Sequence, residues 1–119
     1  MKPQFIWNTA GDWVATLVDG FIFDMAGMWV GWMDGQEVFT TDGEWVGTLS
    51  RDMRILRKRA ASRPPLRTDI PPRPPKPELP GRPTLPPSFS GLDYSTIDVM
   101  EEDPEVFKRL SDMRRDMGE

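Results

Sequence analysis

Hydrophobic residues in the first half of the chain recur with a period of 16 residues. Three segments of the form Gly-x-Trp-Val occupy Gly11–Val14, Gly27–Val30 and Gly43–Val46. Short apolar segments alternate with them at 5–7, 21–23 and 37–39, and a fourth follows at 54–56 after one extra residue. A unit of this length fits two short strands and their turns, so the pattern predicts a mainly β fold of about four β-hairpins.

Strand alternation divides the side chains of these hairpins into two faces. One face is aliphatic in every unit and is the predicted core: Ile6, Val14, Ile22, Val30, Val38, Val46 and Ile55. The other face is aromatic, with Leu56 at its end: Trp7, Trp13, Phe23, Trp29, Phe39 and Trp45. A sheet of about 55 residues has too little chain to cover both faces. The six aromatic residues are therefore predicted either to be covered by another segment or to form a protein-binding surface.

Trp32 departs from this alternation, because counting by twos places it on the aliphatic side, where the neighbouring units carry Thr16 and Thr48. A small hydrophobic ligand in a central channel between the hairpins is the alternative function that these three residues suggest. A Trp at sheet spacing is more often a core residue than part of a ligand site, which favours the interaction surface over the channel.

Aspartate and glycine mark the turns, as in Asp19-Gly20, Asp34-Gly35 and Asp42-Gly43. Such pairs are typical of hairpins because glycine readily adopts the positive φ that tight turns need. Turn geometry alone therefore accounts for the recurring acids. The chain has no His and no Cys, which removes the commonest metal, general-base and thiol chemistries. We expect no enzymatic activity, no cofactor and no metal.

The Gly-x-Trp-Val segments, the Asp-Gly turns and the Pro/Arg-rich run that follows resemble the bacterial 4-fold beta flower domain, over about residues 5–58. The resemblance implies hairpins arranged as petals around a pseudo-fourfold axis, followed by a Pro/Arg-rich tail. It implies no established activity. It also leaves three Trp-Val strands for four apolar segments, so one petal is expected to be incomplete.

Proline recurs at every third residue in the middle of the chain. Six positions make this edge: Pro71, Pro74, Pro77, Pro80, Pro83 and Pro86. Three residues per turn is the period of polyproline II, so we predict a left-handed rod along the proline run of residues 63–87, within an extended Pro/Arg-rich linker at 59–92 that is separate from a β domain at 1–58. The rod is either a semi-rigid spacer or a ligand for aromatic grooves. We favour contact with the aromatic face of this chain or of a second copy.

The last segment, 93–119, carries a helix start at Asp103-Pro104-Glu105, with an acid before the first turn and proline within it. A helix is predicted over about 104–117. Its apolar stripe is Val106, Phe107, Leu110, Met113 and Met117. The stripe either packs back on the β domain or docks in a partner's groove. Residues 94–100 could instead extend an exposed sheet edge.

Charge follows the same three-part division. Residues 1–50, 51–87 and 88–119 carry −6, +7 and −5, within a net charge of −4. Seven cations between 51 and 67 would attract nucleic acid, but both flanks are acidic and no aromatic residue lies among them, so this alternative is disfavoured. No stretch reaches the roughly 18 apolar residues of a membrane span, and residues 1–5 lack a signal-peptide pattern. We expect a cytoplasmic protein-interaction or assembly module whose partner is protein, in a multi-subunit assembly or by self-association.

Overall fold

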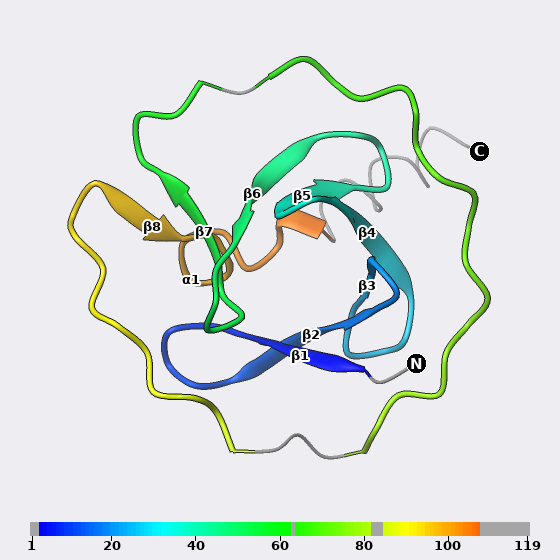
Figure 1. Ribbon diagram of the computed structural model, residues 1–119, viewed down its shortest axis with the longest axis horizontal. Coiled ribbons are helices and arrows are strands. Elements are labelled where there is room, and N and C mark those ends of the chain that lie inside the picture. The colour runs from blue at the N-terminus through cyan, green and yellow to red at the C-terminus, as the bar shows by residue number, and fades with distance from the viewer. Residues whose placement is uncertain (1–2, 63, 82–84, 108–119) are drawn as a thin grey trace.

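The computed structural model describes residues 3–62, 64–81 and 85–107. It is mainly β: one antiparallel sheet of eight strands, in which each strand pairs with the next along the chain. The sheet curls on itself and a long segment encircles it (Figure 1). The strands are β1 (Gln4–Trp7), β2 (Trp13–Val18), β3 (Phe21–Phe23), β4 (Trp29–Asp34), β5 (Glu37–Thr40), β6 (Trp45–Leu49), β7 (Ile55–Lys58) and β8 (Thr96–Asp98).

Three hairpins share one register, offset by 16 residues. Ile6 faces Ala15, Ile22 faces Gly31 and Val38 faces Gly47, while the next pair in each hairpin skips one residue. The skipped residues are Val14, Val30 and Val46. Each is therefore the extra residue of a β-bulge, which locally resets the alternation of side chains between the two faces.

The bulge corrects the predicted position of Trp32. Counting by twos from Trp29 placed this indole on the aliphatic face, but the extra residue at Val30 shifts the count by one. Trp32 instead pairs across strands with Phe21 and Phe39, and its ring stacks on Phe39 with 4.8 Å between the centroids. It therefore lies on the aromatic, outer face of the sheet.

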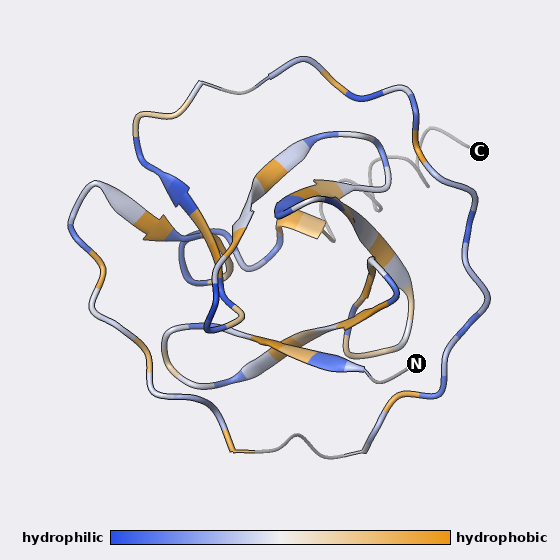
Figure 2. Ribbon diagram, in the orientation of Figure 1, coloured by the Kyte–Doolittle hydropathy of each residue, from blue (hydrophilic) through white to orange (hydrophobic). Residues whose placement is uncertain are grey.

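The predicted aliphatic core is confirmed except at one position. Ile6, Ile22, Val38 and Ile55 are fully buried, and hydrophobic residues gather along the strands in Figure 2. Val14, one of the bulge residues, is only half-buried but packs against the same cluster. Burial of these branched side chains stabilises the fold by about 1.5–3 kcal/mol each.

Four turns have the same hydrogen bonding. They span 8–12, 24–28, 40–44 and 50–54, and in each the first residue exchanges backbone hydrogen bonds with the fourth and fifth. The side chain of the first residue also accepts from the backbone N–H of the fifth: Asn8, Asp24, Thr40 and Ser50 do so. Positive φ at the fourth position falls on Gly11, Gly27, Gly43 and Met53. The fourth turn thus uses methionine where the others use glycine.

The sheet does not end at Lys58. Strand β8 pairs antiparallel with β7, and Arg57 faces Ile97 in the register. Of residues 94–100, which were predicted to extend a sheet edge, 96–98 do so, and Val99 and Met100 begin helix α1. The described residues of 59–95 (59–62, 64–81 and 85–95), which we call the belt, lie between the two strands of one hairpin and run around the rest of the sheet (Figure 1). The Pro/Arg-rich segment is therefore a connection within the domain and not a tail that follows it.

The C-terminal segment also joins the core. Helix α1 covers Val99–Glu102 and is capped by the carboxylate of Asp98, which accepts from the N–H of Met100. Asp103, the predicted start of a later helix, is the C-cap of α1. Val106 and Phe107 are helical and almost fully buried in the core, which favours packing on the domain over docking elsewhere. Leu110, Met113 and Met117, and most of the predicted helix 104–117, lie outside the described residues.

Arg54 joins the two ends of the curled sheet. Trp7 of β1 forms an isolated parallel bridge with Arg54, the residue just before β7, and the N–H of Trp7 donates to the carbonyl of Met53 at 2.8 Å. The Arg54 side chain, 1% exposed, donates to the Asp52 carboxylate, to Thr9 Oγ1 and to the Ser90 carbonyl. One guanidinium thus ties the first turn, the fourth turn and the end of the belt.

The carboxylates around Arg54 complete the network. Asp98, 4% exposed, accepts from both the N–H and the hydroxyl of Thr9 at 2.6 Å. Burial works to raise the pKa of Asp52, but hydrogen bonds from Arg54 and Ser50 outweigh it and hold that pKa below its usual value. Asp52 is therefore charged at neutral pH, as a partner of a buried guanidinium must be.

Replacing Arg54 should open this closure. We expect Arg54→Met to lower the free energy of unfolding by about 3–5 kcal/mol, because it leaves the Asp52 charge unpaired beside the core. Arg57→Met, on the same strand, is the matched control and should change stability by less than about 0.5 kcal/mol. Chemical denaturation followed by Trp fluorescence measures both, and equal losses in the two variants would contradict the assignment.

Candidate functional site

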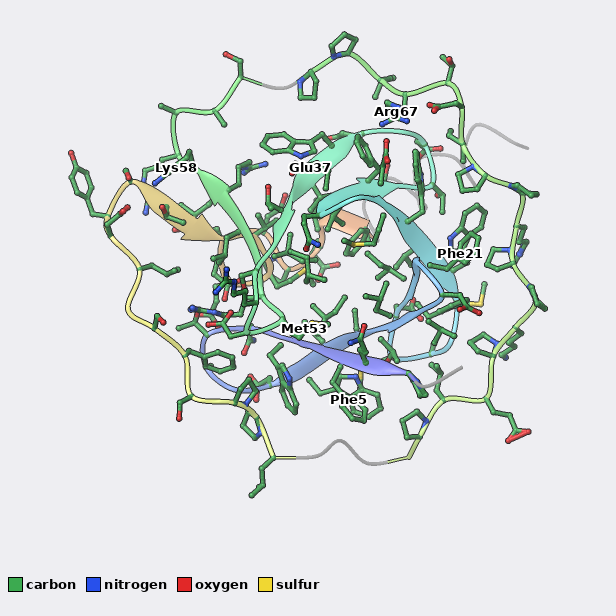
Figure 3. All side chains as sticks on the ribbon, viewed as in Figure 1. Phe5, Phe21, Glu37, Met53, Lys58 and Arg67 are labelled. Atoms are coloured by element: carbon green, nitrogen blue, oxygen red, sulfur yellow. The ribbon has the colours of Figure 1, made fainter. Side chains whose placement is uncertain are left out.

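The outer face of the sheet is built from three rows of side chains, each crossing four strands. The rows are Phe5–Thr16–Phe23–Trp29, Phe21–Trp32–Phe39–Trp45 and Glu37–Thr48–Leu56–Asp98. The first two rows are offset by 16 residues throughout, and the third keeps that offset only at Glu37 and Thr48. Phe5, Phe21 and Glu37, the first members of the rows, are labelled in Figure 3. The rows differ where Trp32 replaces threonine, where Glu37 replaces phenylalanine and where Asp98 takes the place of Trp29 and Trp45.

The six aromatic residues predicted as a binding surface fall into two groups. Trp7, Phe23 and Phe39 are at most 5% exposed and serve as core. Trp13, Trp29 and Trp45 are half-buried at the outside of the hairpins. Only this second group leaves ring surface accessible, so it is the part of the predicted surface that another molecule could contact.

Arg67 attaches the belt to the second row. Its guanidinium lies over the rings of Phe39 and Trp32, 4.9 and 5.2 Å from their centroids. It also pairs with Asp34 at 3.0 Å, and its backbone N–H donates to the carbonyl of Gly43 at 2.9 Å. Figure 3 shows Arg67 between the belt and the sheet. Charge, ring contact and backbone bonding converge on one residue, which makes it the main anchor of the belt.

Trp32, Thr16 and Thr48 were predicted to line a central ligand channel, but the structure gives each of them a different environment. The Trp32 indole N–H donates to the Thr40 carbonyl at 3.0 Å under the Arg67 anchor. Thr16 is fully buried, and the Thr48 hydroxyl donates to the Glu37 carboxylate. A cavity of about 450 Å³ does lie among residues of β1, β2, β4 and β6. Its lining includes Leu17, Met33, Leu49 and Met53 and, among the described residues, none of the three candidates.

The belt passes the first three turns in the reverse order of the chain and then reaches the fourth. A Cβ on Gly43 would lie 2.2 Å from the Arg67 carbonyl oxygen, one on Gly27 would lie 3.3 Å from Lys76 Cε, and one on Gly11 would lie 3.6 Å from the Pro86 ring. The fourth turn is met by Phe89, whose ring lies 4.9 Å from the Arg54 guanidinium. The β domain therefore contacts its own Pro/Arg-rich segment at each of the four turns.

Exposure along the belt follows a period of about three. Pro71, Pro74, Pro77 and Pro80 of the predicted proline edge are half-buried, whereas the residues between them are mostly exposed. Pro83 lies outside the described residues, and Pro86 is exposed where the belt passes the first turn. Pro72, Arg73, Pro75, Lys76 and Glu78 face solvent and form what we call the outer edge.

Charged groups elsewhere suit structure better than nucleic-acid binding. Arg54, one of the seven cations between 51 and 67, is buried, and Arg59 pairs with Glu102 at 3.5 Å. Among the described residues, no three acidic side chains gather where they could hold a metal ion. Within the same residues, no helical segment has the length and apolar character that crossing a membrane requires.

Comparison with known proteins identifies a family. The sequence model described as 4-fold beta flower protein matches residues 2–101. The match therefore extends past Lys58, where the predicted resemblance stopped, and includes the belt and β8. Searches of curated proteins and of solved structures returned no match.

Gly43 provides a test of the belt contact. Both Gly43 and Gly20 have positive φ, but nothing lies within 4 Å of a Cβ on Gly20. Replacement by alanine costs about 1–2 kcal/mol at either position through the backbone, and Gly43→Ala adds a clash with Arg67. We expect Gly43→Ala to lower the free energy of unfolding more than Gly20→Ala and to make the bond after Arg67 more accessible to trypsin. Equal stability and equal cleavage would contradict the contact.

Acid should loosen the Arg67 anchor, because Asp69, next to Arg67 on the belt, holds the guanidinium in the orientation that meets Asp34 and the rings. A hydrogen bond from Arg67 holds the pKa of Asp69 below its ordinary value, so the folded state favours the charged carboxylate. The stability that this hydrogen bond contributes is fully present above the unfolded pKa of about 3.9, and it is lost as pH falls through the lower folded pKa. We expect the Arg67 backbone N–H, which donates to the Gly43 carbonyl, to become more accessible to hydrogen exchange, relative to its intrinsic rate, when exchange is carried out below about pH 4. Asp69→Asn should already show that accessibility at pH 7, whereas Glu78→Gln should behave as wild type.

Proposed function

This chain belongs to the 4-fold beta flower family, and we propose that it is a non-enzymatic protein-interaction module. The β domain holds the inner edge of the belt, which consists of the half-buried residues Pro71, Pro74, Pro77 and Pro80. The outer edge binds a partner protein in an assembly. The partner offers an aromatic groove with acidic groups, since such grooves bind proline-rich segments. The module acts as an accessory subunit in the cytoplasm.

The observation that supports this function most directly is the division of the belt into two edges. Pro71, Pro74 and Pro77 are half-buried on the domain side, while Pro72, Arg73 and Pro75 are exposed. Holding an extended segment in place before binding reduces the conformational entropy lost on association. The domain would therefore serve as a rigid mount that keeps the outer edge ready for its partner.

The proposal includes a specific arrangement of the hairpins. Three hairpins with equal registers and equal turns are consistent with three of four petals around a pseudo-fourfold axis, and the turn at 50–54, which has the same hydrogen bonds, joins the third petal to the fourth. The fourth petal consists of β7 and β8, with the belt inserted between them. Polyproline II geometry of the belt fits the three-residue period of its exposure.

The outer edge can be tested without disturbing the domain. A tagged full-length chain carrying Pro72→Ala, Arg73→Ala and Pro75→Ala should lose a specific protein that the wild type recovers from cell extract, by about tenfold or more as measured by quantitative mass spectrometry. The loss follows because these side chains present the proline and charge pattern that such a groove reads.

The matched control is Leu85→Ala, at a belt residue that is 91% exposed and outside the outer edge. It should recover the partner as the wild type does. Near-UV circular dichroism should be the same for all three proteins. Recovery of one and the same set of proteins by wild type and triple variant would contradict the proposed function.

A further inference from the structure

A cleft of about 340 Å³ opens on the third row of the outer face, between β6 and β7. Trp45, Thr48, Leu56 and Ala61 are among the residues that line it. Thr48 and Leu56 are direct cross-strand neighbours, and both are half-buried. The cleft lies away from the outer edge of the belt and has the volume of a small-molecule site.

The equivalent places on the other two rows are filled. On the first row, the Trp13 indole N–H donates to Thr16 Oγ1 at 3.1 Å, so its ring lies against that threonine. On the second row, Trp32 itself occupies the position and Arg67 lies over it. The fold therefore accommodates an indole ring at the second position of a row. In the first row the ring comes from Trp13, earlier on the same strand, and in the second row it comes from Trp32 itself.

Glu37 explains why the third row stays open. The Trp29 indole N–H donates to the Gly31 carbonyl of its own strand, at 2.7 Å. The Trp45 indole N–H instead donates to the Glu37 carboxylate across the hairpin, at 2.8 Å. Glu37 also accepts from Thr48. These bonds turn the Trp45 indole toward β5, so that it forms one wall of the cleft. Among the described residues, no other side chain of the third row covers Thr48.

The charged residues that line the cleft, Arg57 and Lys58, are both cations. Arg57 forms no ion pair with any described residue. Lys58 pairs with Asp93 at 3.7 Å, but the two side chains are 63% and 65% exposed. A pair this exposed contributes little and exchanges readily with another anion. The cleft thus combines an indole wall, an aliphatic floor and positive charge at its edge.

We propose that this cleft binds a small aromatic carboxylate. The planar ring lies between Trp45 and Ala61 over Leu56, in the place that Trp32 takes on the second row, and the carboxylate faces Lys58 and Arg57. The site is separate from the proposed docking edge of the belt, so either one can fail without the other.

Indole-3-acetate is the probe for the site, and the neutral indole-3-acetamide is its control. In ¹H–¹⁵N spectra of the full chain, titration with indole-3-acetate should shift the Trp45 indole resonance saturably, at one ligand per chain. That resonance is assigned by its loss in Trp45→Phe. The amide should bind about fivefold more weakly, the factor that one exposed ion pair supplies.

Thr48→Trp should abolish binding, because it fills the cleft as Trp32 fills its own row. Met28→Trp, at a half-exposed position in another turn, adds an indole elsewhere and should bind as wild type. Ala61→Phe closes the cleft from the belt side and tests the same point should Thr48→Trp fail to fold. Combined Arg57→Gln and Lys58→Gln should remove the preference for the acid over the amide, whereas Arg51→Gln should keep it.

Three results would overturn the proposal. The first is no saturable shift of the Trp45 resonance at millimolar probe. The second is undiminished binding by folded Thr48→Trp and Ala61→Phe. The third is a Trp45 resonance that shifts with protein concentration alone and tracks dimer formation, which would make a second copy of the chain the occupant of the cleft.

Discussion

The fold depends on a single buried cation that closes the curled sheet. Arg54 is almost inaccessible to solvent, and its bonds reach Asp52 in its own turn, Thr9 in the first turn and Ser90 at the end of the belt. The Thr9 hydroxyl in turn donates a hydrogen bond to the carboxylate of Asp98 in β8. A curled sheet would otherwise expose two edges. Here the edges meet through side chains and one backbone bridge, and a guanidinium with several fixed donors is suited to joining groups from different directions.

This closure also sets the path of the belt. Because β7 and β8 are partners in one hairpin, the belt leaves and returns to the same place, and its length allows it to go around the sheet rather than across it (Figure 1). A long loop costs little more entropy to close than a short one, but holding it against the surface needs attachment. Arg67 near its start and Phe89 near its end provide that attachment, each by stacking a guanidinium against aromatic rings.

Local pattern predicted the strands, the turns and the buried aliphatic residues, because each depends on residues close in sequence. Three features could not be read in this way. A β-bulge adds one residue without a special residue type, so the position of Trp32 was displaced by one at Val30. The pairing of Leu56 with Asp98 joins residues on opposite sides of the proline segment, and no local signal marks them as partners. Arg54 was counted with the surface cations because its burial depends on Thr9 and Ser90, which are distant in sequence.

Met53 shows how the closure alters the repeat. The fourth position of each turn has positive φ, which favours glycine for backbone reasons alone. Among the three glycines at this position, the belt excludes a Cβ only at Gly43, where the Arg67 carbonyl oxygen would lie 2.2 Å away. At Gly27 and Gly11 the nearest belt atoms would lie 3.3 and 3.6 Å from a Cβ, and side chains can adjust to such distances. At the fourth turn the belt reaches the Arg54 side chain and not the turn backbone. A side chain is therefore sterically possible there, and Met53 packs against the core, which offsets part of the backbone strain. The break in the glycine pattern thus falls at the turn where the belt is held by a side chain.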